Sequence, residues 1–291
     1  MKQLHTKPIS LSNLLYRFRA KILYTWTLVV AEAVLLLLFP LFMGIAIDDF
    51  VKGSYRGLYA LTGIAFVSLI AGAGRRFYDT RTYAQIYTTI SPEMVEKEQR
   101  RNSTTSVISA RVNLATEFVE FLENHFPAMF ASIIALSGTI IIIYFMNINV
   151  FFACVISTIL IGILYALTSR KTYSLNGDFN SELENQVSVL SGNEPHIIAT
   201  HFKNVMRWNI RLSDLETVNF SLSWIVLMAL LVYAIIAVIE SGISAHGQVL
   251  AILMYVFNYI ESVITIPLFY QQFVRLKEIA HRLEYGEQKI N

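Results

Sequence analysis

Two glutamates stand deep inside long apolar stretches of the sequence. Glu32 lies about ten residues into the first apolar stretch and Glu261 about twelve residues into the last. At about 1.5 Å per helical residue, each would lie roughly 15 to 18 Å deep, near the midplane of a bilayer. A charge at that depth costs a few kcal/mol and usually marks a substrate pathway, an ion pathway or a partner. Both glutamates are therefore candidates for a substrate or proton pathway.

Polar residues accompany both glutamates at helical spacing. Asn258, Glu261 and Thr265 stand at i, i+3 and i+7, which places them on one helical face. Thr25 precedes Glu32 by seven residues and shares its face. A polar stripe of this kind is typical of a helix that lines a water-filled cavity. Asn258 and Thr265 therefore join the predicted pathway.

The two glutamates have no Lys or Arg inside the apolar stretches to neutralise them. Desolvation without a cation favours the protonated acid. This suits a proton-coupled step or the binding of a cationic substrate. The structural alternative at both positions is a protonated glutamate that only hydrogen-bonds between helices.

The remaining acids and the histidines suggest simpler roles. Three acids repeat every three residues shortly before the third apolar run, namely Glu117, Glu120 and Glu123. They are expected to pair with arginines that follow the second apolar run, namely Arg75, Arg76 and Arg81. Acids near the ends of apolar stretches are expected to be solvated loop charges, namely Asp48, Asp49 and Glu240. The histidines His125, His196 and His201 lack metal-ligand spacing. No metal and no cofactor is predicted.

The composition indicates a membrane protein. Apolar residues make up 55% of the 291 residues, charged residues 15%, and the mean hydropathy is +0.51. A typical soluble domain has roughly 45–50% apolar and about 25% charged residues. The single cysteine, Cys154, lies in an apolar run and is expected to be an inert buried thiol. The excess of apolar residues needs a lipid bilayer as solvent.

Six apolar runs approach the length of about 20 residues that crosses a bilayer as a helix. They do not alternate as the strands of a membrane barrel would. The predicted spans are about 22–47, 57–74, 126–146, 150–167, 220–239 and 249–270.

The distribution of Lys and Arg predicts the orientation of these spans. The three short connectors hold only Lys52 and Arg56, so the other 21 of the 23 Lys and Arg lie in the termini and the two long connectors. The positive-inside rule then places both termini and both long connectors in the cytoplasm. The expected location is a bacterial-type inner (plasma) membrane.

The two long connectors, 75–125 and 168–219, carry apolar residues at helical spacing on both arms. Polar breaks at 97–105 and 191–195 divide each connector into two arms. Two arms of about 25 residues would project on the order of 35 Å from the membrane. The predicted fold is an all-α membrane protein with six transmembrane helices and two long cytoplasmic helical hairpins.

The ends of the chain are expected to lie outside this six-span domain, which runs from 22 to 285. Residues 1–21 include the amphipathic sequence LSNLLYRFRA, which predicts an elbow helix on the inner leaflet or a simple continuation of the first span. Residues 286–291 form a polar tail.

Three segments resemble the transmembrane domain of exporter-type (type IV) ABC transporters. PLFMGIAIDDF at 40–50 is similar to the end of the first span of that family, ISARVNLATEFVEFLE at 108–123 to the helix after the first coupling tip, and SGNEPHIIA at 191–199 to the second tip. The resemblance implies a homodimer with one cavity and two tips that contact ATPase subunits. The coupling-tip candidates are Glu96, Lys97, Arg100, Arg101, Glu194, Ile197, Ile198 and Phe202.

An ATPase motif is not found in this sequence, because no Lys follows a Gly and the pattern G-x-x-x-x-G-K-[ST] cannot occur. The chain is therefore not expected to hydrolyse ATP, unless a separate subunit does so. The first tip is also more hydrophilic than the family pattern implies.

Three interpretations follow for function. In the first, the chain moves a small-molecule or peptide substrate on an ion gradient, which is slightly favoured; in this respect it is similar to the SbmA/BacA peptide importers, which lack the ATPase and use protons. In the second, a separately encoded ABC ATPase supplies the energy. In the third, the chain is a non-transporting assembly or regulatory protein. Nucleic acid is not an expected partner.

Overall fold

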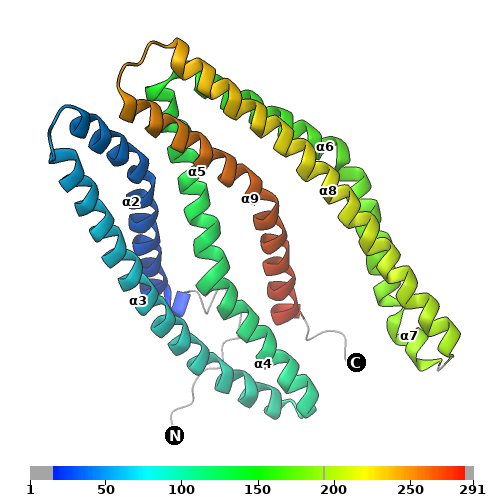
Figure 1. Cartoon of the computed structure of the whole chain (residues 1–291). Helices are drawn as coiled ribbons and strands as arrows, with labels where there is room; N and C mark the ends of the chain where they lie inside the picture. The colour runs from blue at the N-terminus through cyan, green and yellow to red at the C-terminus, as the bar shows by residue number, and fades with distance from the viewer. Residues whose placement is uncertain (1–15, 193, 286–291) are drawn as a thin grey trace, which may run out of the picture. The chain divides into compact units, whose positions relative to one another are not determined.

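The computed structural model describes residues 16–192 and 194–285, and within this part the chain is helical with no strand (Figure 1). The helices are α2 (Arg19–Val51), α3 (Arg56–Arg100), α4 (Thr105–Glu120), the π-helix η1 (Phe121–His125), α5 (Phe126–Met146), α6 (Ile148–Glu184), α7 (Gln186–Ser191), α8 (Pro195–Glu240) and α9 (His246–Tyr285). Six helical segments are long and apolar enough to cross a membrane, with α4, η1 and α5 forming one of them. The predicted all-α fold with six spans is confirmed.

The helices form two compact units. The first contains the described residues up to Ile142 and those from Ile243, and the second contains Ile143–Gly242. The second unit is therefore a hairpin of α6 and α8 with α7 at its end. The limits of the predicted domain, 22–285, stay a prediction, and the tail 286–291 lies outside the described residues.

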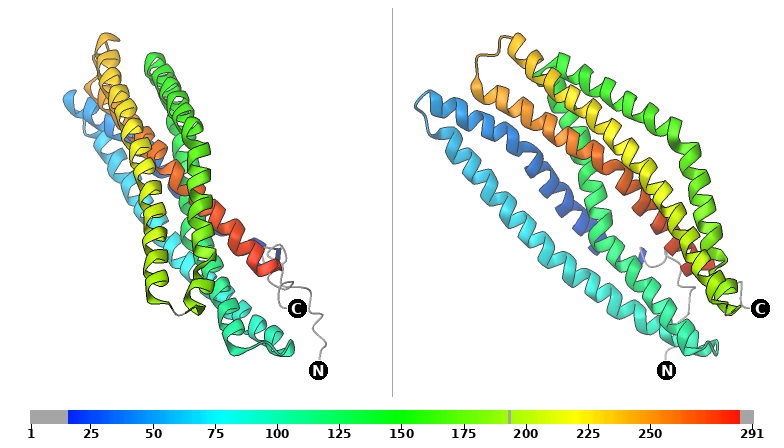
Figure 2. Two further views of the ribbon diagram at one scale, coloured as in Figure 1. Left: turned by 90° about the vertical axis from the view of Figure 1, so that its right-hand side faces the viewer. Right: turned by 45° about the vertical axis from the view of Figure 1, so that its right-hand side comes forward.

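In the first unit, α2 and α3 run side by side in opposite directions (Figures 1 and 2). Beyond its apolar part α3 continues as one helix to Arg100, and α4 returns beside it. Both arms of the first long connector are helical and pack through apolar side chains, as their helical spacing predicted. The core of this part comprises Tyr83, Ile86, Ile90, Met94, Phe118, Phe121, Leu122 and Ile279, with Ile22 from α2.

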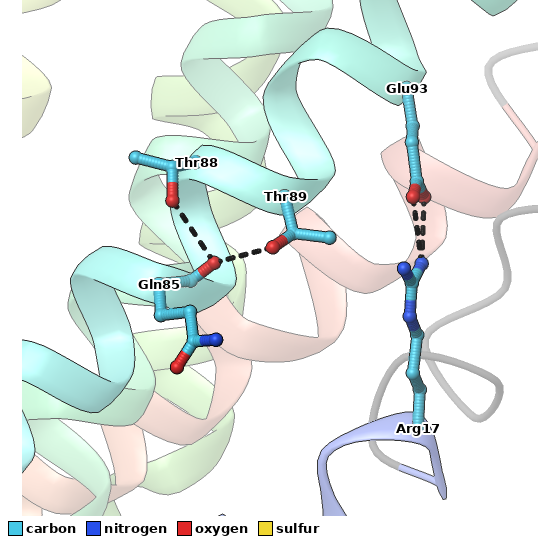
Figure 3. A network of polar contacts seen from close by, with 5 residues as sticks. All are labelled: Arg17, Gln85, Thr88, Thr89 and Glu93. Carbon is cyan, nitrogen blue, oxygen red and sulfur yellow. Dashed lines mark hydrogen bonds and ion pairs between the residues drawn. The ribbon is translucent and has the colours of Figure 1, made fainter.

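The start of α2 and the residues just before it are held against α3 by polar contacts. Arg17 Nη1 donates to both carboxylate oxygens of Glu93 at 2.8 and 3.0 Å (Figure 3), and Lys21 donates to Gln85. In the same region of α3, Thr88 and Thr89 donate to the Gln85 carbonyl (Figure 3). Residues 1–15 of the predicted elbow lie outside the described residues.

The second unit packs α6 against α8 along their length. Its core consists of small and branched side chains, among them Val150, Cys154, Ile161, Leu227, Ala234 and Val238. Two polar contacts join the helices outside the apolar runs: Asn219 Nδ2 donates to Thr168 Oγ1 at 3.0 Å, and His201 Nδ1 lies 2.9 Å from Glu182 Oε1. These contacts hold the two arms of the second hairpin in register.

Asp48 and Asp49 at the end of α2 accept hydrogen bonds from the first turns of two other helices. The Gly57 N–H of α3 donates to Asp49 Oδ2 at 2.9 Å, and the Gly247 N–H of α9 donates to Asp48 Oδ1 at 2.6 Å. A carboxylate at a helix N-terminus pairs free N–H groups and favours the helix dipole. The expectation that these two acids are solvated loop charges was wrong.

The N-terminus of α9 meets α2 backbone to backbone. A Cβ atom placed on Gly247 would lie 1.8 Å from the Gly44 carbonyl oxygen and 2.8 Å from Asp48 Cγ. Only glycine fits this contact, because both neighbouring groups belong to the α2 backbone or to the capping carboxylate.

We expect Gly247→Ala to destabilise the protein by about 1–3 kcal/mol, because the added methyl group forces α9 away from α2. Thermal unfolding in detergent measures the change. Gly63→Ala is the matched control, since nothing lies within 4 Å of a Cβ at that position of α3, and it should leave stability unchanged or raise it. An unfolding temperature of Gly247→Ala equal to that of the control would contradict the close contact.

Candidate functional site

A buried polar cluster joins α2 and α3. Arg75 donates through Nε to Glu32 and through Nη1 to Asp79 Oδ2, the latter at 2.9 Å. The side chains of Arg75 and Glu32 are each 18% exposed and that of Asp79 is 5% exposed. Glu32 therefore has a cationic partner, and the expectation that no Lys or Arg neutralises it was wrong.

The ion pair with Arg75 also shows where Glu32 lies along the α2–α3 helix pair. Arg75 directly follows the apolar stretch 57–74 of α3, so the pair lies where that stretch ends. Counted along α2, Glu32 is about 24 Å from Asp48 at the other end of the helix pair. Glu32 thus pairs with the residue that directly follows the apolar stretch of α3, and its depth in the bilayer stays a prediction.

Further buried oxygen atoms surround Asp79. Thr25 and Tyr83 are fully buried, and among the described residues Thr25 Oγ1, Tyr83 OH and Asp79 Oδ1 lack a well-formed hydrogen bond. The Thr25 hydroxyl acts on Asp79 from α2, and Asp79 acts electrostatically on Tyr83 one turn further along α3. Few buried polar atoms in proteins go unpaired, so this group of three is a candidate for function.

Asp79 lies five residues beyond the apolar stretch 57–74 and is the most buried acid of the cluster. Burial raises the pKa of its carboxyl group, and the nearby Thr25 hydroxyl and the charge of Arg75 oppose this only in part. The charge of Glu32 raises this pKa further. Asp79 was not among the residues predicted from the sequence. The signal for it was the i, i+4 spacing of Arg75 and Asp79 directly after a span.

Glu261 lies on an exposed face of α9. Among the described residues it forms no ion pair, and its carbonyl accepts a hydrogen bond from the Thr265 hydroxyl at 3.2 Å. Asn258 and Thr265 are half-buried on the same side. The buried face of α9 carries Tyr255 and Tyr259 instead. The structure keeps the predicted stripe together, and its role in a pathway stays a prediction.

The acidic stripe of Glu117, Glu120 and Glu123 was expected to pair with Arg75. The guanidinium of Arg75 forms its ion pairs with Glu32 and Asp79 instead. Arg81 donates to the Phe77 carbonyl at 2.9 Å and its guanidinium lies over the Phe77 ring. The end of the stripe, Glu123, falls in η1. A π-helical turn inside a long helix often marks a functional position.

The first hairpin end is closed by its own polar groups. Glu98 is 5% exposed, accepts a hydrogen bond from Ser103 Oγ at 2.7 Å, and lies 3.6 Å from Arg101 and 3.9 Å from Arg111. Asn102 takes the left-handed conformation with φ of 56°, which asparagine tolerates better than most residues. Glu96 and Arg100, two of the predicted tip residues, form an exposed pair at 2.6 Å.

The second hairpin end has the opposite character. Val187 on α7 is 75% exposed, and Ile197 at the start of α8 is 54% exposed. Phe202 is also exposed and Ile198 is half-buried, while Glu194 precedes α8 as its N-cap residue. This end, defined by Val187, Leu190, Ile197 and Phe202, exposes an apolar surface outside the apolar spans.

The helices and hairpins define a class of polytopic α-helical membrane proteins. The model of one family, described as ABC transporter transmembrane region, matches residues 11–247. The chain belongs to this family, and the resemblance inferred from the sequence is confirmed. Within these 291 residues no family of nucleotide-binding domains is matched. No curated protein matches the chain in sequence.

We expect Glu98→Ala to loosen the first hairpin end, because it removes the buried carboxylate that accepts the hydrogen bond of Ser103 Oγ. Lost hydrogen bonds to a charged group cost about 1.5–3 kcal/mol, so amide hydrogen exchange at 98–106 should speed up roughly tenfold or more. Hydrogen exchange with mass spectrometry measures this.

Glu96→Ala is the matched control, since it removes an exposed pair worth less than about 1 kcal/mol from the same turn of α3. Equal exchange rates at 98–106 in the two variants would show that Glu98 does not close the turn.

Proposed function

We propose that this chain is a membrane transporter built on the ABC transmembrane fold, and that an ion gradient, not an ATPase of its own, drives it. Its place in the ABC transmembrane family supports a membrane transport role. The proposal of an ion gradient as the energy source rests on the Glu32–Arg75–Asp79 cluster, in which two acids share one cation. A gradient-driven carrier needs a group that changes charge at the edge of the membrane, and this cluster supplies candidates.

The first hairpin end supports the same proposal. An ATPase that docks by apolar contact needs exposed apolar side chains there, whereas this end presents the charged pair Glu96–Arg100 and buries Glu98 within itself. Charged groups at a rim contribute little affinity and are screened by salt. Mechanical coupling of an ATPase through this end is therefore disfavoured.

In this proposal α9 contributes Glu261, Asn258 and Thr265 to the substrate pathway. Glu261 is exposed and forms no ion pair within the described part of the chain. An unpaired carboxylate in an apolar segment attracts a cationic substrate or a proton. A homodimer in a bacterial inner membrane with cytoplasmic termini is the expected setting, and cationic peptides or cationic small molecules are the expected substrates.

A second candidate function is the transmembrane subunit of a transporter with a separate ABC ATPase. The exposed apolar surface of the second hairpin end favours it, since Val187, Ile197 and Phe202 are all exposed. Apolar side chains exposed outside a membrane segment often mark a protein contact.

The first test is transport by purified protein in liposomes. A short cationic peptide and a cationic fluorescent dye serve as probes under an imposed pH difference. We expect uptake of at least one probe without ATP, and we expect Glu261→Gln to reduce it about tenfold or more, as loss of a pathway charge implies. Glu240→Gln, at the exposed end of α8, is the control and should transport normally. Unaltered uptake by Glu261→Gln would sink its assigned role.

The second candidate is tested by affinity purification from native membranes in mild detergent. If a separate ATPase docks at the second hairpin end, an ATP-binding subunit should copurify, and Ile197→Asp with Phe202→Asp should release it. Tyr173→Asp on the same hairpin, a still more exposed apolar site away from its end, is the control. Recovery of the chain without any ATP-binding subunit counts against this candidate.

A further inference from the structure

We propose that the Glu32–Arg75–Asp79 cluster is a proton-binding site in which Asp79 is the group that gains and releases the proton. This inference deepens the proposed function and rests on it for its biological meaning, although its test needs no transport. The sequence predicted Glu32 as the proton-binding acid, whereas this proposal assigns that role to Asp79 on the neighbouring helix α3.

The charges of the cluster favour one bound proton. Arg75 contacts both Glu32 and Asp79, so the three side chains carry a net charge of −1 when both acids are ionised and none when one is protonated. All three are largely buried. An unbalanced charge in a buried place costs far more than a neutral, hydrogen-bonded group.

Asp79 is the better of the two acids to carry the proton. Glu32 holds Arg75 through Nε and is 18% exposed, whereas Asp79 is 5% exposed and leaves Oδ1 without a well-formed hydrogen bond. The burial-driven rise in its pKa points the same way. Glu32 and Arg75 then form a neutral pair beside a neutral acid.

The surroundings of Asp79 suit both of its charge states. The buried hydroxyl groups of Thr25 and Tyr83 have no well-formed hydrogen bond within the described residues. A hydroxyl donates to an ionised carboxylate and accepts from a protonated one. The proton comes from water, forms an O–H bond at Oδ1 and leaves by the reverse step, with Arg75 kept by Glu32 throughout.

The charged and titratable groups around Asp79 come from α2, α3 and η1. Glu32 faces it from α2, Arg75 and Tyr83 from α3, and Glu123 of η1 acts electrostatically on Tyr83. Apart from Arg75 these groups are acids or a phenol.

The test is the pH dependence of thermal unfolding of the full-length protein in detergent, between about pH 5 and pH 9. A folded state that holds a proton which the unfolded chain releases is stable at low pH and loses that stability as the pH rises. The unfolding temperature of the wild-type protein should therefore fall with rising pH. Asp79→Asn, neutral at every pH, should lose this fall.

Glu93→Gln is the matched control. It neutralises an acid on the same helix, exposed and paired with Arg17, and it should keep the wild-type slope. Glu32→Gln gives Arg75 to Asp79 alone, so Asp79 should remain ionised and the fall should again be lost.

Two results would overturn the proposal: a wild-type slope in Asp79→Asn, or failure of this variant to fold while Glu93→Gln folds. Asparagine has the shape and charge of the protonated acid, so the proposal requires that it be tolerated. Because no substrate is used, a failure of gradient-driven transport leaves this result standing. If the pH dependence of unfolding is the same in Asp79→Asn as in the wild type while gradient-driven transport is intact, the proton-binding site is refuted and the proposed transport function is not.

Discussion

The register between α2 and α3 is the constraint on which the candidate site depends. At one end Asp49 accepts the Gly57 N–H, and a Cβ on Gly57 would lie 2.7 Å from Ala46 Cα. At the other end Gly72 lies against the Glu32 carboxylate. These two glycines let the helices approach closely enough for Arg75 to reach across. A shift of one residue would rotate Arg75 by about 100° around α3 and leave two acids buried without a cation.

Helix α2 also positions α9, so one helix serves both groups of candidate residues. Asp48 holds the start of α9, and the Tyr255 hydroxyl donates to the Leu37 carbonyl at 2.9 Å further along. Because Tyr255 and Tyr259 face the packed side, Glu261 is directed to an exposed face of α9. The same contacts that fix the helix therefore determine which of its polar residues remain accessible.

The spans and hairpins could be predicted from the sequence because length, hydropathy and helical spacing are local properties. The two arms of the first long connector, whose core contains Ile86, Ile90 and Phe118, were predicted as helices for this reason. The partner of Glu32 could not be predicted, since Arg75 is 43 residues away and only the register between two helices brings it near. Asp48 was wrongly predicted to be a solvated loop charge for the same reason, because its partner Gly247 is 199 residues away. The stripe on α9, within one helix, needed no such information.

The two hairpin ends impose different conditions on any partner, and this follows from where each places its polar groups. At the first end Glu98 is satisfied by Ser103, by Arg101 and by Arg111 of α4, so contact there means contact with exposed charges that salt screens. At the second end Ile197 and Val187 remain exposed, so burying them is favourable by about 25 cal/mol per Å². A partner that binds through the hairpins must therefore gain its affinity at the second end, and the first end can at most orient it.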